Sequence, residues 1–421
     1  ASDVYKRQGH FTAEAIAPDI QPVVNSDELV DINWPLEEIA SDQFQIAGGW
    51  GGGTFVGSVG VTLNNLSIKN FFKKGAWRPY PMGQNQRLSI SAQTNGTYYK
   101  AFAISFTDPW MGGRKPNSFT ISAHYSDENN AYYAWQKGTR YFRTAGVAAG
   151  LGKRLDWPDP YFTFYAEASY ERYMLKDWNT FVLKNGAANL LSIRLVLGRN
   201  SVDQPIYPRR GSDFSVSVQL TPPYSLWDGK DYKSTALSEQ ERYNWIEFHK
   251  WMLKGQWFTP LTRNGNLVLM ARAEMGYLGH YNKNKVSPFE RFEVGGDGMT
   301  GYNMYGIDII SMRGYDDGAL DPVGSNYSCA YNKYTMELRY PLLLKGQTNI
   351  YVLGFLEGGN GFTSWKEFSP FKIKRSAGIG VRLFLPVVGM VGVDWGWGFD
   401  PAAGQTKRSG SHIHFTMGMQ F

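Results

Sequence analysis

The chain lacks the features that mark helical membrane proteins, disulfide-rich proteins and nucleic-acid-binding proteins. Cys329 is the only cysteine among 421 residues, which excludes an intramolecular disulfide framework and a cysteine-ligated zinc site. No apolar run reaches the about 18 residues that a helical membrane span needs. Lysine and arginine are scattered in spite of the net charge of +6, so no basic stretch favours binding of nucleic acid.

Motifs of export and catalysis are also missing. Residues 1–8 are polar and charged, without the apolar core of a signal peptide, so an exported protein would be represented here by a mature fragment or a truncated gene product. No Gly-x-Ser-x-Gly occurs, which argues against an esterase of the nucleophile-elbow type. Residues 296–301 have the spacing of a dinucleotide-binding loop but lack the flanking strand and helix. We therefore predict no enzymatic activity and no cofactor.

Aromatic residues are abundant and charged residues are scarce, at 15% and 19% of the chain. This combination is typical of membrane interfaces, where amphipathic rings lie at the level of the lipid headgroups. From about residue 42 onward, short runs alternate between apolar and polar side chains, and there are about 16 of them. In the last run, Ile413, Phe415 and Phe421 share one face and His414 and Gly418 share the other, because strand side chains alternate.

The polar face of these runs carries Gly, Ser and Thr rather than the Lys and Glu of a sheet that faces water. The sequence therefore predicts an all-β fold, a transmembrane antiparallel β-barrel of about 16 strands with its apolar face toward lipid. The connections alternate in length, and in such barrels short turns face the periplasm and longer loops face outside. The short connections are 262–265, 341–347 and 385–389, and the long ones are 221–242, 281–327 and 399–410.

The first residues differ from the rest of the chain. The runs 9–15 and 28–34 alternate like two strands around a polar, proline-containing turn, which favours the remnant of a small α+β module. We therefore divide the chain into an unassigned leader at 1–8, a module fragment at 9–41 and a barrel at 42–421.

The long connection 281–327 contains a glycine-rich stretch, residues 290–321, and Arg313 lies within this stretch. Glu337 belongs to a run in which polar side chains alternate with apolar ones, so it is expected to point into the lumen. An unpaired arginine is costly in an interior of low dielectric constant, and its planar fork suits carboxylates. Two interpretations remain: Arg313 pairs with lumen carboxylates, or it is solvated in an external loop.

Several motifs carry a resemblance to a known family. Residues 289–296 precede a loop motif, residues 105–110 read Ser-Phe-Thr-Asp-Pro-Trp, and the chain ends on the aromatic Phe421. The loop motif consists of Met312, Arg313, Gly314 and Tyr315. From residue 9 onward the sequence resembles the BamA family of outer-membrane β-barrel assembly factors, whose loop signature is Val-Arg-Gly-Phe. The first and last residues of the motif depart from that signature conservatively.

The resemblance implies insertion and folding of β-barrel proteins in the outer membrane of a Gram-negative bacterium, with no nucleotide and no covalent step. It implies unfolded outer-membrane protein clients, BAM accessory lipoproteins and outer-membrane lipids as partners, and no nucleic acid. Residues 9–41 resemble the end of the last POTRA module, which lies in the periplasm. In the family the loop arginine binds acidic groups of the barrel wall, and Glu357 matches a position usually held by aspartate. The resemblance thus implies that Glu337 and Glu357 are the lumen partners of Arg313.

The resemblance also implies a lateral seam, where the first strand meets the last and can pair with the terminal strand of a client. Glycines at 48–53 would weaken this seam, although they would equally suit the first external turn. The expected seam residues are Gln43, Phe44, Gln45, Ile46, Ala47, Gly48, Gly49, Trp50, Ile413, Phe415, Gly418 and Phe421.

Other interpretations stay open. A TamA-like barrel or a two-partner-secretion translocation barrel shares the loop arginine, and the number of upstream periplasmic modules would distinguish these classes. A passive porin or an outer-membrane enzyme would lack the loop motif. His412 and His414 share one strand face, but two ligands without a third favour lumen lining over a metal site.

Overall fold

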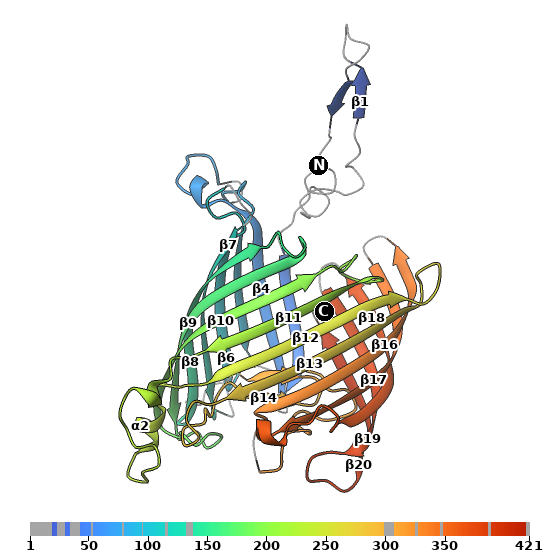
Figure 1. The fold of residues 1–421 in the computed structure, drawn as a ribbon. Helices are drawn as coiled ribbons and strands as arrows, with labels where there is room; N and C mark the ends of the chain where they lie inside the picture. The colour runs from blue at the N-terminus through green and yellow to red at the C-terminus, as the bar shows by residue number, and fades with distance from the viewer. Residues whose placement is uncertain are drawn as a thin grey trace.

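The structure is a computed structural model, and it describes residues 19–22, 30–33, 43–51, 54–77, 80–94, 96–113, 117–131, 138–298, 307–324, 327–345, 348–385 and 389–417. Its main element is an antiparallel sheet of sixteen strands that curls into a barrel (Figure 1). The predicted fold class and strand number are confirmed. In the described part of the chain, no helix is both long and apolar enough to cross a membrane.

In chain order, the elements are β1 (Asp19–Pro22), β2 (Val30–Asn33), β3 (Gln43–Gly51), β4 (Thr54–Leu66), η1 (Ile68–Asn70), β5 (Gln86–Thr94), β6 (Tyr99–Asp108), β7 (Asn117–Asn129), β8 (Tyr141–Arg154), β9 (Phe162–Lys176), β10 (Gly186–Asn200), β11 (Gly211–Leu220), η2 (Tyr224–Leu226), α2 (Glu239–Tyr243), β12 (His249–Pro260), β13 (Val268–Gly279), β14 (Phe292–Val294), β15 (Asp308–Ile310), β16 (Ala330–Lys345), β17 (Thr348–Phe362), η3 (Trp365–Glu367), β18 (Lys374–Leu385), β19 (Gly389–Pro401) and β20 (Arg408–Met417).

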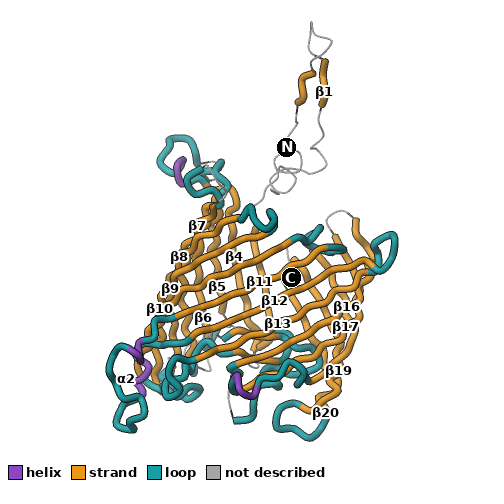
Figure 2. The backbone as a smooth tube through the Cα atoms, in the orientation of Figure 1, coloured by secondary structure: helices purple, strands orange, loops and turns teal. Residues whose placement is uncertain are grey.

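The barrel strands pair in chain order, and the short strands β14 and β15 stand outside this sheet. At one edge β3 pairs with β4, and at the other edge β20 pairs with β19. Within the residues that the structure describes, no ladder joins β3 to β20, so each of these strands has one unpaired side. Figure 2 shows how the strands tilt as they follow one another around the barrel.

The strands turn their apolar side chains outward. On β19, Val393 and Trp395 are exposed, whereas Asp394 between them is fully buried. On β20, Ile413 is 65% exposed and the next residue, His414, is only 4% exposed. An apolar outer face and a polar inner face are the reverse of a soluble protein and suit a barrel surrounded by lipid.

From β11 onward, the longest connections gather at one end of the barrel. The long connections 221–248 and 280–329 lie at the end that carries α2, and the short turn 261–267 lies at the other end (Figure 1). This arrangement follows the alternation predicted from the sequence. The first strands depart from it. Residues 67–85, between β4 and β5, form a long connection at the end with the short turns, and β5 and β6 are joined by a short connection at the end that carries α2.

A separate antiparallel hairpin precedes the barrel, and in it Asp19 pairs with Asn33. Its second strand falls within the predicted run 28–34. The partner of that strand is Asp19–Pro22 and not the run 9–15, which lies outside the described residues. Alternation alone specifies register weakly here, because both strands are exposed and no buried face selects one pairing.

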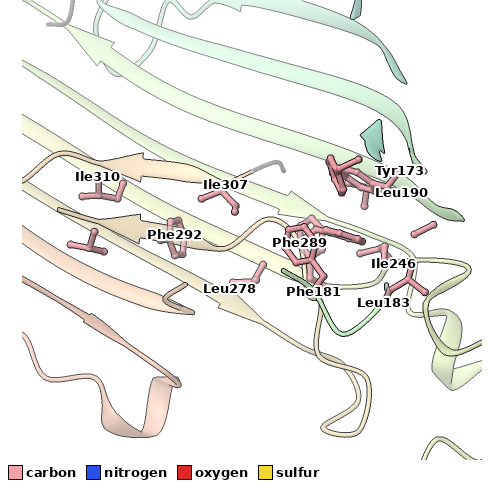
Figure 3. Close-up of a cluster of buried hydrophobic side chains, with 14 of the residues drawn as sticks. Tyr173, Phe181, Leu183, Leu190, Ile246, Leu278, Phe289, Phe292, Ile307 and Ile310 are labelled. Atoms are coloured by element: carbon pink, nitrogen blue, oxygen red, sulfur yellow. The ribbon is translucent and has the colours of Figure 1, made fainter. Parts of the chain in front are cut away.

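The described parts of the connection 280–329 pack inside the barrel and form a core there (Figure 3). β14 and β15 pair in parallel, and Phe289, just before β14, is fully buried. The Phe289 ring stacks on Tyr173 of β9 with centroids 4.4 Å apart and meets Phe181 edge-on at 4.9 Å. These aromatic contacts hold the connection against the wall of the barrel.

We expect Phe289→Ala to destabilise the folded barrel by about 3–5 kcal/mol, because it leaves a cavity between the connection and the wall. The measurement is the urea midpoint of the purified barrel, followed by its heat-modifiable gel mobility. Phe371→Ala is the matched control, since Phe371 is 89% exposed, and its midpoint should stay unchanged. Equal midpoints for the two variants would contradict the role of this core.

Candidate functional site

The loop motif follows β15 after one residue, Ser311, and all residues of the motif are buried. Gly314 has a φ of +86°, which side chains rarely adopt. A Cβ at this position would lie 2.9 Å from Ser376 Cβ on β18 and 3.0 Å from the backbone nitrogen of Gly398 on β19. Glycine therefore allows the loop to touch the inner wall, and it presents Arg313 to the neighbouring strands.

The Arg313 guanidinium contacts two carboxylates. Its Nη2 lies 2.7 Å from Glu337 Oε1 on β16 and 2.6 Å from Glu357 Oε1 on β17. The backbone N–H of Arg313 donates to Glu357 Oε2 over 2.9 Å, and the guanidinium lies 3.7 Å from the centroid of the Phe355 ring. Burial opposes the charge, but Glu357 and Glu337 outweigh it and raise the pKa of Arg313, so the group stays charged. The structure brings together the three charged residues singled out from the sequence.

Three further charged residues, Asp394, Arg382 and Arg339, join Arg313, Glu337 and Glu357, and we call these six residues the lumen cluster. The sequence analysis did not single out the three additional residues as site residues. Asp394 Oδ2 on β19 lies 3.6 Å from Arg313 Nη1 and 2.7 Å from Arg382 Nη2 on β18. Arg339 Nη2 lies 2.7 Å from Glu337 Oε2. Three arginines thus face three carboxylates, which balances the buried charge. Strand alternation could have identified these three residues as inward-facing, because each stands between two apolar neighbours that face outward.

The part of the same connection around β14 and β15 is anchored to a different part of the wall. Lys250 Nζ on β12 lies 3.2 Å from Glu290 Oε2 and 2.8 Å from Asp308 Oδ2. The Tyr173 hydroxyl on β9 donates to Glu290 over 3.0 Å. The connection therefore spans the lumen, from β9 and β12 to the lumen cluster on β16–β19.

The loop motif also contacts the last strand. The Gly314 N–H donates to His414 Nε2 on β20 over 2.8 Å, so this ring nitrogen carries a lone pair and not a proton. His412 Nδ1 lies 3.2 Å from Asp316 Oδ1, just after the motif. Both histidines line the lumen, and they connect the loop to one edge of the sheet. The contact of these histidines with the loop depends on how deeply the loop enters the barrel. The alternation of polar and apolar residues in the sequence carries no information about that depth.

The expected seam residues fall at the two edges of the sheet. Residues 43–50 belong to β3, and Ile413 and Phe415 lie on the exposed face of β20. Gly418 and Phe421 lie outside the described residues.

From the sequence, the glycines at 48–53 suited either the end of a weak first strand or the first external turn. Gly48 pairs with Gly57 and Gly49 pairs with Val56 in the β3–β4 ladder. The turn interpretation is therefore wrong for these two glycines, while residues 52–53 lie outside the described residues. Glycines inside an edge strand contribute no side-chain packing and weaken the pairing of that strand.

Fold and site together define a class of protein, a membrane-spanning β-barrel whose lumen holds a loop anchored by arginine. The Omp85 superfamily domain matches residues 82–421, so the chain belongs to the Omp85 superfamily. It is an outer-membrane β-barrel protein of a Gram-negative bacterium, from a family of insertion and translocation proteins.

The chain is 23% identical over 343 residues to the outer membrane protein assembly factor BamA of Neisseria meningitidis serogroup B (strain ATCC BAA-335 / MC58). This match covers 76% of the chain and 35% of the relative, so the chain spans about a third of that relative's length.

Two solved structures share the fold. BamA from Haemophilus ducreyi lacking POTRA domains 1–3 has a TM-score of 0.61 at 18% identity, over 98% of this chain and 76% of that one. CdiB from Escherichia coli has a TM-score of 0.57 at 12% identity, over 97% of this chain and 68% of that one. The barrel is thus BamA-like in fold and sequence.

Arg313→Ala should lower the stability of the folded barrel by about 3–5 kcal/mol, because it leaves buried carboxylates without their cation. The temperature at which heat-modifiable gel mobility is lost measures this. Arg313→Lys should give an intermediate value, since it keeps the charge and loses the planar fork. Arg375→Ala, which removes an exposed arginine 2.9 Å from Asp400, is the control and should change little. Identical losses for Arg313→Ala and Arg375→Ala would show that the lumen cluster does not hold the loop.

His414→Leu should lower the same transition, because the buried Gly314 N–H then lacks an acceptor at a cost of about 1–3 kcal/mol. His414→Gln retains a side-chain acceptor and should stay closer to the parent protein. A leucine variant as stable as the glutamine variant would argue against a link between the loop and β20.

Proposed function

We propose that this barrel inserts and folds β-barrel client proteins in the outer membrane through a lateral seam between β3 and β20. The supporting observation is that the described sheet ends on these two strands, whereas every strand between them has a neighbour on both sides. An edge strand offers a row of N–H and C=O groups to an incoming strand. The terminal strand of a client would add to β3 through such backbone hydrogen bonds.

The two sides of the seam have different roles in this proposal. β20 is the fixed side, because it pairs with β19 and its His414 accepts a hydrogen bond from Gly314 of the loop. β3 is the adaptable side, because Gly48 and Gly49 lie inside it and add no side-chain packing. The lumen cluster keeps the β16–β20 wall in shape while β3 exchanges its partner.

No bound fuel is needed for this exchange. A client that leaves water for the membrane buries its own apolar side chains, and each large one contributes about 1.5–3 kcal/mol. The barrel lowers the kinetic barrier to insertion by offering a template strand, and the client supplies the free energy of insertion. Insertion of this kind involves no covalent step and no enzymatic reaction.

The remaining assignments belong to the same proposal. Residues 9–41 are the end of a POTRA module in the periplasm, which places the short turns of the barrel at the periplasmic side and the long loops outside. Unfolded outer-membrane proteins are the clients, and accessory lipoproteins of a BAM complex are the partners.

A translocation barrel is the second candidate, because CdiB from Escherichia coli shares the fold. Translocation would pass a chain through the lumen, where the connection 280–329 now lies. That connection would have to release Arg313 from the wall, whereas insertion through the seam leaves it in place. Fixing the loop therefore separates the two functions.

We expect the seam to be trapped shut by oxidation when Ala47→Cys is combined with Ser411→Cys or Ile413→Cys in a Cys329→Ser background. Client insertion into vesicles should then fall to background and return on reduction, because β3 can no longer exchange partners. Each single-cysteine protein, oxidised in the same way, is the control. Undiminished insertion by the crosslinked protein would rule out the seam.

The loop provides the complementary experiment. Ser311 Oγ and Lys333 Nζ lie 3.3 Å apart, so a short thiol crosslinker between Ser311→Cys and Lys333→Cys should hold the loop against β16. Insertion through the seam should continue in this protein, whereas a translocation barrel should be blocked.

A further inference from the structure

The connection between β4 and β5, residues 67–85, has no role in the seam mechanism and carries an unusual surface. It projects at the end of the barrel that has the short turns (Figure 1). Phe72 is 93% exposed, which is an unfavourable position for an aromatic side chain in water. The exposed apolar side chains of this connection are Ile68, Phe71, Phe72, Trp77 and Met82, which we call the aromatic knob.

The base of the connection has a defined structure. Asn65 Oδ1 accepts hydrogen bonds from the N–H groups of Gly83 and Asn85 over 3.2 and 3.1 Å. Asn70 Nδ2 donates to the carbonyl oxygen of Met82 over 3.0 Å. These bonds tie the two arms of the connection together at its base.

The aromatic rings hold one another at the tip. Phe71 meets Phe72 and Trp77 edge-on, with ring centroids 5.3 and 5.0 Å apart. Trp77 Nε1 donates to the carbonyl oxygen of Phe71 over 3.1 Å. The polar group of the indole is thus satisfied within the connection, and the apolar rings stay exposed.

Basic residues neighbour the apolar ones in the sequence of this connection. Lys69, Lys73 and Lys74 are exposed, Arg78 adds a further positive charge, and residues 67–85 contain no Asp or Glu. Aromatic rings together with a cluster of lysines are typical of segments that bind an anionic membrane surface. The rings lie among the headgroups while the ammonium groups meet phosphate charges.

The knob continues a surface that already faces lipid. Val59 of β4, Ile90 of β5 and Phe102 of β6 are exposed on the outside of the adjoining strands. At the same end of the barrel, Trp110 follows β6, and Trp157, which is 82% exposed, follows β8. Exposed apolar residues therefore continue from the outer face of these strands to the end of the barrel that carries the knob.

We propose that residues 67–85 dock on the anionic phospholipid headgroups of the leaflet at this end of the barrel. Phe72 and Trp77 lie in the interface, and the lysines bind lipid phosphates. Docking requires only the barrel in a bilayer, whereas naming this leaflet as the periplasmic one rests on the proposed function. Because β4 pairs with β3, the docked connection gives the adaptable side of the seam a fixed point in the membrane.

The test places a bimane label on Phe72→Cys in a Cys329→Ser background. The bimane group keeps an apolar ring at position 72, and the serine removes the native thiol. The folded full chain is reconstituted in vesicles of phosphatidylcholine, alone or mixed with phosphatidylglycerol. We expect nitroxide lipids to quench the label and the quenching by aqueous iodide to fall several-fold when phosphatidylglycerol is present. A label equally open to iodide in both membranes would overturn the proposal and leave a soluble partner as the occupant of this surface.

Charge variants provide the second measurement. Replacing Lys69, Lys73 and Lys74 with Gln should abolish the effect of phosphatidylglycerol on the label. Replacing Lys366, Lys372 and Lys374 with Gln removes as many charges near the other end of the barrel and should leave the effect intact. An unchanged effect in the first variant would refute binding to anionic lipid.

A reporter on Gln204→Cys, an exposed residue in the β10–β11 connection, is the positional control. It should stay open to iodide in both membranes, and a response equal to that of the Phe72 label would remove the specific role of residues 67–85. None of these measurements needs a client, so failure of the seam mechanism and failure of lipid docking are distinguishable.

Discussion

The ion pairs of Arg313 are the interaction on which the rest of the lumen depends. A charged group taken out of water is stable only beside groups of opposite charge, and Arg313 finds them on β16, β17 and β19. These strands must therefore keep their stagger for the carboxylates to converge on one guanidinium. The same turn places Gly314 against β18 and β19 and beside His414 of β20. One buried charge thus fixes the loop, five strands of the wall and one edge of the sheet relative to one another.

This arrangement divides the barrel into two unlike parts. Around β16–β20 the lumen is filled by the loop and its charges. Beside β5–β12 it contains a polar cavity of about 700 Å³, bordered by Gln93, His124, Arg194 and Lys254. A packed region transmits strain and resists deformation, whereas a region lined by polar groups around water-sized space can change shape without creating dry voids. The difference fits a fixed edge at β20 and an adaptable edge at β3.

Much of the fold follows from alternation, and the limits of alternation explain what it misses. Period two predicts the strands and turns Glu337 inward, because facing is a local property. Which inward carboxylates meet Arg313 depends on strand stagger. Asp394 lies on β19, 81 residues after Arg313, so alternation identifies it as inward but not as a partner. The parallel pairing of β14 with β15 and the contact of His414 with the loop depend on a connection folding back into the lumen. Alternation gives no prediction for residues 67–85, because polar and apolar residues follow no regular spacing in this connection.

The energetics of an unpaired edge explain why a weak strand is useful at this position. Backbone N–H and C=O groups facing lipid cost several kcal/mol each when unsatisfied, so β3 and β20 gain from any strand that covers them. Closure of the barrel on itself and addition of a client strand satisfy the same backbone groups and therefore compete directly. Gly48 and Gly49 take side-chain packing away from closure, but they leave the backbone donors and acceptors that a client uses. A client strand with large apolar side chains then has the advantage, because it brings to the seam the packing that β3 lacks.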